Sequence, residues 1–259
     1  MLSLPPSLSY RADGDVGILQ LNRPEKRNAL DDVTVLALGA FFDAPPPEVR
    51  AIVLCGAGDH FSAGLDLAQV PDWDPVAGMT SSMHWHRAFQ AMEFGTLPVV
   101  AVLKGAVIGG GLEIAAATHV RVAERSAYYA LPEGQRGIFV GGGGSVRLPR
   151  LVGTARVMDM LLTGRTYDAE SGANAGFTQY VVDDGAGMAK ALELAHRMAA
   201  NAPLSNFAAM HALPRIAEAP PATGFLTEAA VAAITSSSPE AKRRVEDFLQ
   251  KRTAKIVRT

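Results

Sequence analysis

Two glycine-rich segments and two glutamates carry most of the chemical information in this chain. The segments are residues 61–67, FSAGLDL, and residues 104–115, KGAVIGGGLEIA, and the acids are Glu113 and Glu133. Glycine lets a chain turn tightly and approach a ligand closely, so each segment can present backbone N–H groups. Two N–H groups aimed at one oxygen form an oxyanion hole. Carboxyl groups beside such a hole can act as general acid and base.

Both glutamates stand where a carboxyl group needs an explanation. Glu113 lies in the apolar run GLEIAAA, where an unpaired carboxylate would be costly to bury. Glu133 lies in the turn ALPEGQRG, between a proline and a glycine, and taken alone it is more typical of a solvated turn residue. If the two flank one water molecule, they can share its protons, and their titrations should be coupled.

The elements that would position these residues alternate between short apolar strands and helices. Such alternation is typical of an α/β fold with a largely parallel sheet. Strands are expected at 16–21, 51–55, 99–103, 119–123 and 179–182, and helices at 31–43 and 82–94. A further helix should begin near Gly110, so that its N–H groups and dipole favour a developing anion.

The remaining segments are expected to be loops or helices. Residues 45–47, PPP, predict a surface connector, and residues 71–81, rich in turn formers, predict a loop. After residue 182 the periodicity predicts helices only, at 187–203, 204–218, 224–237 and 239–252.

Composition restricts the classes of partner. With 259 residues, 48% of them hydrophobic and 19% charged, the chain is expected to form one large globular domain, with or without an appendage. A net charge of −2 and a pI near 6.3 give no general reason to bind nucleic acid or an anionic membrane. The single cysteine, Cys55, rules out an internal disulfide framework and is expected to be a buried strand thiol. Because the start lacks a secretory signal and no run could span a bilayer, we expect a cytoplasmic protein.

Other site types are weakly supported. His84 and His86 are two residues apart on an expected helix and point to different faces, so we expect no metal site. His60 stands where a serine hydrolase elbow around Ser62 would need its first glycine, so a nucleophilic serine is not expected. The basic run at 242–244 is too short to predict nucleic-acid binding.

The order and spacing of these motifs resemble the crotonase superfamily, and within it the enoyl-CoA hydratases, over about residues 14–255. The resemblance implies a spiral of ββα repeats with the coenzyme A and catalytic sites in residues 1–195. It also implies a C-terminal helical trimerisation region at 196–259, and a homotrimer or a dimer of trimers. No internal repeat of fixed period is visible in the sequence itself.

The resemblance also implies roles for individual residues. The N–H groups of Leu65 and Gly110 would form the oxyanion hole. Glu113 would activate water and Glu133 would protonate the α carbon, with the roles reversed in dehydration. Gly141, at the start of a helix, would line the water site. Two departures from the family bear on the second acid: Val140 replaces a proline, and Arg136 could either pair with Glu133, lowering its pKa, or point into solvent.

Coenzyme A would be part of the substrate, and no separate cofactor is expected. The resemblance places its adenine and phosphates near Arg27, Ala63, Asp66 and Leu67, with Phe248 and Lys251 added from the C-terminal helix. Without the resemblance, Phe248 would be read as helix packing and Lys251 as surface charge.

The resulting expectation is an enoyl-CoA hydratase, a lyase that reversibly adds water to a 2-enoyl-CoA. One alternative is a 3-enoyl-CoA to 2-enoyl-CoA isomerase, which needs the same hole but only one well-placed acid, and the other is a different crotonase-type acyl-CoA enzyme. A non-catalytic CoA-binding role would predict loss of the acids, and an RNA-binding role would need a basic helix that is absent from the sequence. The acyl group stays open, since the residues at 70–94 and around Phe139 would set the pocket length.

Overall fold

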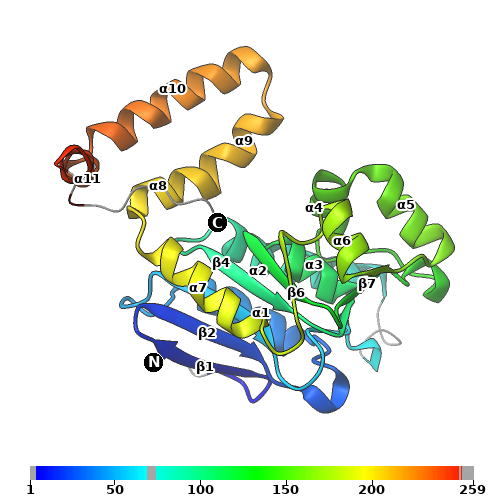
Figure 1. The fold of residues 1–259 in the computed structure, drawn as a ribbon. Coiled ribbons are helices and arrows are strands. Elements are labelled where there is room, and N and C mark those ends of the chain that lie inside the picture. Colours follow the sequence, from blue (N-terminus) through cyan, green and yellow to red (C-terminus); the bar gives the residue numbers. More distant parts are fainter. Residues whose placement is uncertain (1–3, 69–73, 251, 253–259) are drawn as a thin grey trace. The chain divides into compact units, whose positions relative to one another are not determined.

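The computed structural model describes residues 4–68, 74–250 and 252, and it divides the chain into two compact units (Figure 1). The first unit, Met1–Ala199, contains two β-sheets and the helices α1 to α7. The second unit, Ala200–Thr259, is helical through its described elements. The division falls directly after α7 (Gly187–Ala199), so that this helix stays whole within the first unit.

The larger sheet has six strands in the order β1-β2-β3-β4-β6-β9. Only β1 is antiparallel to its neighbour, and the other pairs are parallel, as the alternation predicted. Five strands match expected runs to within one residue, and β1 was missed because its sequence, LSYRAD, mixes polar and apolar residues without strict alternation. The bounds are Leu8–Asp13 for β1, Val16–Leu21 for β2, Ala51–Gly56 for β3, Val99–Leu103 for β4, Val120–Glu124 for β6 and Tyr180–Val182 for β9.

Both faces of the larger sheet are buried, which explains why its central strands are almost wholly apolar. Helices α1 (Asp32–Asp43) and α2 (Pro75–Glu93) contribute to the apolar cluster on one face, and α7 packs on the other. Cys55 belongs to the face under α7, is buried as predicted, and has its thiol pKa raised to about 11 by that burial.

The smaller sheet has three short strands in the order β5-β7-β8. They are β5 (Ala106–Ile108), β7 (Tyr128–Ala130) and β8 (Tyr167–Asp168). Each of the first two follows a strand of the larger sheet and precedes a helix, giving the turns β4-β5-α3 and β6-β7-α4. The strand β3 is followed in the same way by Ser62, which bridges Val107 of β5, and then by α2. These are successive ββα turns of the spiral.

Helix α2 corrects one expectation. The segment 71–81 was expected to be a loop, yet Pro75 to Ser81 form the first turns of α2, while residues 69–73 lie outside the described residues. The side chain of Asp74 accepts a hydrogen bond from the N–H of Ala77 at 2.7 Å, and Pro75 occupies the first helical position. Asp followed by Pro is a helix start signal, and the turn formers concealed it.

Helices α3 to α6 alternate along the chain with the strands of the smaller sheet and with β6. Helix α3 runs from Gly110 to Ala116, beginning where the sequence predicted. Helix α4 (Gly144–Val152) begins three residues after Gly141, so the prediction that Gly141 starts a helix is wrong; residues 141–143 form a turn before it. Helices α5 (Thr154–Thr163) and α6 (Ala169–Ala175) follow.

The second unit consists of α8 (Pro203–Phe207), a π-helical turn (Ala208–Ala212), α9 (Leu213–Glu218), α10 (Pro221–Ser237) and α11 (Pro239–Leu249). Its helices were predicted, although the run 204–218 is divided by the π-helical turn. Large apolar side chains on this unit are exposed, including Phe225 at 71% and Leu226 at 73%. Among the described residues, no helix has both the length and the apolar character needed to cross a membrane.

Candidate active site

Three segments of chain reach the same edge of the smaller sheet. Ser62 donates its N–H to Ala106 O and accepts from Ile108 N, both at 3.0 Å, so it runs parallel to β5. On the other side of β5, β7 is also parallel. Since the carboxyl ends of parallel strands meet at one edge, the segments after Ser62, Ile108 and Ala130 converge. They carry Leu65, Gly110 and Glu133, respectively.

The N–H groups of Leu65 and Gly110 lie next to each other. A Cβ on Gly110 would be 3.3 Å from Leu65 N, and a Cβ on Gly64 would be 2.7 Å from Gly110 N. Gly64 has a φ of +82°, a left-handed conformation that glycine adopts without strain. Within the described residues, neither N–H group has a hydrogen-bond acceptor. Two adjacent unpaired donors are the arrangement that stabilises an oxyanion.

Ser62 supports this turn and is not arranged as a nucleophile. Its Oγ donates to Asn28 O at 2.8 Å and accepts from Gly64 N at 3.1 Å, and the residue is fully buried. The hydroxyl is therefore fully engaged in fixing the segment that presents Leu65.

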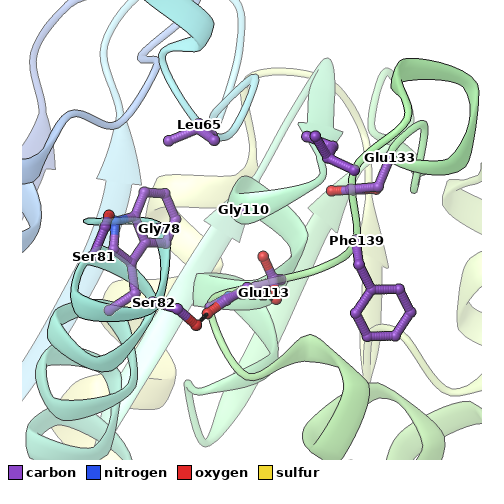
Figure 2. Close-up of a pocket in the computed structure, with 12 residues that line it drawn as sticks. Leu65, Gly78, Ser81, Ser82, Gly110, Glu113, Glu133 and Phe139 are labelled. Carbon is purple, nitrogen blue, oxygen red and sulfur yellow. Dashed lines mark hydrogen bonds between the residues drawn. The ribbon is translucent and has the colours of Figure 1, made fainter. Parts of the chain in front are cut away.

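A cavity of about 260 Å³ lies beside the two N–H groups (Figure 2). Helix α2 supplies one wall, with Trp85 packed against Gly110 so closely that a Cβ there would lie 2.6 Å from the indole ring. Ile138 and Phe139 come from the segment after Glu133. The full lining is Leu65, Gly78, Ser81, Ser82, Trp85, Gly110, Glu113, Glu133, Ile138, Phe139, Gly141 and Gly142.

Glu113 extends from α3 into this cavity and is only 3% exposed. Its Oε1 accepts hydrogen bonds from Gly142 N at 2.8 Å and Gly144 N at 2.7 Å. Burial raises the pKa of this carboxyl, and the hydrogen bonds from the glycine turn and the charge of Arg147 act in the opposite direction. The turn therefore compensates in part for the cost of keeping an ionised carboxylate inside the protein.

Glu133 lines the same cavity in a different environment. It is 6% exposed, and its Oε2 has no hydrogen-bond partner in the part of the chain that the structure describes. Burial, together with the negative charge of Glu113, raises its pKa to about 7. Arg136 is exposed and forms no ion pair with Glu133 among the described residues; its charge opposes the rise in pKa only as the smallest contribution. A Cβ at Gly109, where φ is +53°, would lie 2.6 Å from Glu133 Oε1, so this site depends on glycine.

Gly141 lies at the cavity wall, in the turn that precedes α4. Its carbonyl oxygen accepts a hydrogen bond from Ser82 Oγ at 2.6 Å, which joins the turn to α2. The structure therefore brings together five of the predicted residues, Leu65, Gly110, Glu113, Glu133 and Gly141, around one cavity.

The residues expected to hold coenzyme A form a second group at the segment 63–67. The N–H of Ala63 donates to Arg27 O at 2.8 Å, and Arg27 itself adopts a left-handed φ of +51°. Asp66 accepts from Arg23 at 2.8 Å and from Lys26 at 3.0 Å, and the bond to Arg23 is the main reason its pKa is lowered. Leu67 is 40% exposed. Arg23 and Lys26 were not singled out from the sequence.

The two C-terminal residues expected to bind coenzyme A, Phe248 and Lys251, are not part of this group. Phe248 lies on α11 in the second unit and is 58% exposed, and Lys251 lies outside the described residues. His84 and His86 are exposed on α2, and the described residues contain no cluster of three or more His, Cys, Asp or Glu side chains suited to a metal ion.

Comparison with known proteins identifies the family. The family model for enoyl-CoA hydratase/isomerase matches residues 11–257, nearly the whole chain. The chain belongs to the enoyl-CoA hydratase/isomerase family. The resemblance read from the glycine-rich turns and the two glutamates is thereby confirmed.

Relatives within the family are similar over most of their length. The enoyl-CoA hydratase EchA19 of Mycobacterium tuberculosis is 32% identical over 95% of each chain, and the 2,3-dehydroadipyl-CoA hydratase of Escherichia coli is 31% identical over 91% of this chain and 92% of its own. A crystal structure of a Rhodopseudomonas palustris protein assigned to the enoyl-CoA hydratases is 55% identical, with a TM-score of 0.93, covering 96% of this chain and 97% of that one. The predicted crotonase-like fold is confirmed.

Several residues at the site were not assigned from the sequence. Gly78, Ser81, Ser82 and Trp85 line the cavity from one face of α2, at the spacing of successive helical turns. That spacing could have identified them had the helix been extended back to Pro75. Arg147, which influences Glu113, gave no comparable signal, because its contacts join segments distant in the chain.

Proposed function

We propose that this protein is an enoyl-CoA hydratase that adds water reversibly to a 2-enoyl-CoA thioester. The observation that carries the proposal is the presence of two buried carboxyl groups, Glu113 and Glu133, in one cavity beside the adjacent N–H groups of Leu65 and Gly110. Relatives over nearly the full chain are named as hydratases, which supports the same reaction.

In the proposed reaction the thioester carbonyl oxygen accepts hydrogen bonds from Leu65 N and Gly110 N. Negative charge moves onto this oxygen as water adds at the β carbon, so the two donors stabilise the transition state more than the substrate. Removing one such donor typically costs about 100- to 1000-fold in rate.

The carboxyl groups divide the proton transfers. Ionised Glu113 takes a proton from water while the water oxygen bonds to the β carbon, and protonated Glu133 gives a proton to the α carbon. In this turnover the hydroxyl group comes from water and the α hydrogen comes from Glu133. Transfer of the proton from Glu113 to Glu133 then restores the starting state, so that the net change is the addition of one water molecule. Burial, together with the negative charge of Glu113, raises the pKa of Glu133 to about 7, so this carboxyl can carry the proton that it donates near neutral pH.

The substrate is proposed to bind through its coenzyme A portion at Arg27, Ala63, Asp66 and Leu67. Arg23 and Lys26 add positive charge to this surface, although both pair with Asp66. Phe248 and Lys251 are proposed to contact the nucleotide across a subunit boundary. The reaction needs no separate cofactor, since coenzyme A arrives as part of the substrate and the proton transfers use side chains alone.

We also propose that the second unit mediates assembly into a trimer or a dimer of trimers. Its helices expose Phe225, Leu226 and Leu249, each more than 70% accessible, and exposed large apolar side chains favour protein–protein contact where they gather.

The alternative function is isomerisation of a 3-enoyl-CoA, which moves a proton from the α carbon to the γ carbon. That reaction uses the same two N–H donors but one acid–base residue, so the burial of both glutamates in one cavity favours hydration. The test is to incubate the protein with crotonyl-CoA, with longer and aryl enoyl-CoAs, and with a 3-enoyl-CoA. Formation of 3-hydroxyacyl-CoA supports the hydratase, and formation of 2-enoyl-CoA without hydration supports the isomerase.

A further inference from the structure

A buried arginine connects the site to the far end of α2. Arg147 on α4 is 7% exposed, and its Nε donates to Glu93 Oε2 at 2.7 Å. Its Nη1 donates to the carbonyl oxygen of Gly142 at 3.1 Å. Glu93 is the last residue of α2, the helix that forms one wall of the cavity.

Arg147 contacts one of the two glycines that hold Glu113. Gly142 donates its N–H to Glu113 Oε1 and accepts from Arg147 through its carbonyl, so this one residue is held at both ends. Gly144 supplies the second N–H to the same carboxylate oxygen. The guanidinium therefore fixes the residue on which the geometry of Glu113 depends.

The turn has little freedom to adopt another arrangement. Gly143 has a φ of +93°, and a Cβ there would overlap Nη1 of Arg147. A Cβ on Gly144 would lie 2.7 Å from Glu113 Cγ. Helix α2 holds the turn at a second point, where Ser82 Oγ donates to Gly141 O.

We propose that Arg147, held by Glu93, is a positioning residue that sets the glycine turn 142–144 against Glu113 and so orients the carboxylate that activates water. The proposal rests on the hydratase function proposed above. Neither Arg147 nor Glu93 lines the cavity, so neither is expected to contact the substrate. Their effect is expected in the chemical step, through Glu113, and not in coenzyme A binding.

The charge of Arg147, like its hydrogen bonds, favours Glu113 as an ionised base. The charged groups around Glu113 are Arg147 from α4 and Glu133 from the facing segment; Glu93 pairs with Arg147, and His86 lies beside Gly143. Of these, Arg147 lowers the pKa of Glu113. Removing this cation should make Glu113 harder to ionise, and the acidic limb of kcat/KM should then move to higher pH.

The experiment compares four variants by steady-state kinetics across pH. Arg147→Met removes both the charge and the hydrogen bonds, Arg147→Lys keeps the charge without the forked geometry, and Glu93→Gln keeps Arg147 but removes its anchor. Arg150→Met, at an exposed position on the same helix, is the matched control. Thermal unfolding and acyl-CoA binding are measured on each variant.

The expected result separates geometry from charge. Arg147→Met lowers kcat by about 100-fold, with KM little changed and the acidic limb moved upward, in line with the cost of misplacing a reacting group. Arg147→Lys and Glu93→Gln lower kcat by about tenfold without moving the limb upward, and Arg150→Met behaves as wild type. If Arg147→Met does not fold, the other two variants decide the proposal. A wild-type kcat in both Arg147→Lys and Glu93→Gln would overturn the proposal. So would losses of kcat that only parallel a lower Tm, if the acidic limb of kcat/KM also stays at its wild-type pH in Arg147→Met.

A second measurement keeps this proposal separate from the proposed function. Glutamate carboxyls labelled with ¹³C are titrated by NMR, and Glu113 is assigned by its absence in Glu113→Gln. A higher Glu113 pKa in Arg147→Met supports the positioning role, even if the wild-type protein hydrates no substrate tested. If Arg147→Met does not fold, a changed chemical shift of the Glu113 carboxyl in Arg147→Lys supports it instead. An unchanged titration and shift in every folded variant overturns it, whatever reaction the enzyme catalyses.

Discussion

Glu113 and Glu133 line the same cavity, but only Glu113 has both its position and its charge supported by the surrounding backbone. Two N–H groups donate to Glu113 Oε1, at 2.8 and 2.7 Å, whereas Glu133 Oε2 has no hydrogen-bond partner among the described residues. Backbone donors stabilise an ionised carboxylate, and a buried, unpartnered oxygen favours the neutral acid. This difference supports the proposed roles of Glu113 as the base and Glu133 as the acid.

Replacing either acid should abolish hydration while leaving substrate binding intact. Glu113→Gln removes the base and Glu133→Gln removes the proton donor, and loss of one acid–base group costs about 100- to 10,000-fold in kcat. Steady-state kinetics give kcat, and a binding assay with a saturated acyl-CoA gives the affinity. Substantial hydration by Glu133→Gln would contradict the two-acid assignment.

The buried Glu133 should lower stability as pH rises. Its pKa is raised from 4.5 to about 7 in the folded protein, so the folded state holds its proton more tightly than the unfolded state. The stability associated with this proton is present in full below pH 4.5 and is lost as pH rises through about 7.

The Glu133→Gln variant makes this effect measurable, because its side chain is neutral at every pH. Relative to wild type, it should gain at most about 3 kcal/mol in free energy of unfolding between pH 4 and pH 8. Urea unfolding of both proteins at the two pH values gives the difference. If the difference in free energy of unfolding between the two proteins does not change with pH, burial does not raise the pKa of Glu133.

A methyl group between the two N–H donors should block the oxyanion hole. In Gly110→Ala the added Cβ would lie 2.6 Å from the Trp85 ring and 3.3 Å from Leu65 N, so either the indole moves or the substrate oxygen is excluded. We expect a loss of at least about 100-fold in kcat. Leu65→Val is the matched control, because it keeps the backbone donor and should retain most activity. Equal losses in both variants would show that the side chain of Leu65, and not its N–H, matters.

The acidic residue beside the expected coenzyme A surface should affect binding alone. Asp66 holds Arg23 and Lys26 in place, and Asp66→Asn weakens both ion pairs, so KM for acyl-CoA should rise with kcat little changed. Asp43→Asn, at an exposed position at the end of α1, serves as the control for a lost surface carboxylate. A fall in kcat at constant KM in Asp66→Asn would place Asp66 in the chemical step instead.

The sequence predicted those elements whose hydrophobic pattern extends over several residues. The strands β2 and β4 were predicted to the residue because their runs, VGILQL and VVAVL, are continuously apolar and buried on both faces. The strands of the smaller sheet have two or three residues, too few for any periodicity to be seen. The start of α2 was missed because Asp74 and Pro75 act equally well as turn formers and as a helix start.

The candidate site shows the same limit. The glycine turns and the two glutamates could be identified because each lies within a short, unusual stretch of sequence. Arg147 and Glu93 are 54 positions apart, and nothing local indicates that a buried arginine will pair with the last residue of α2. The pairing forms because folding brings the end of α2 to Arg147, next to the turn at Gly142.

The most direct test of the account is incorporation of oxygen from water. The protein is incubated with a 2-enoyl-CoA in H₂¹⁸O, and the product is analysed by mass spectrometry, with Glu113→Gln in parallel. We predict one ¹⁸O atom at the β carbon of a 3-hydroxyacyl-CoA formed by the wild type, and no such product with Glu113→Gln. The hydratase function would be contradicted if the wild type left short, long and aryl 2-enoyl-CoAs unreacted and unlabelled but converted a 3-enoyl-CoA to the 2-enoyl isomer.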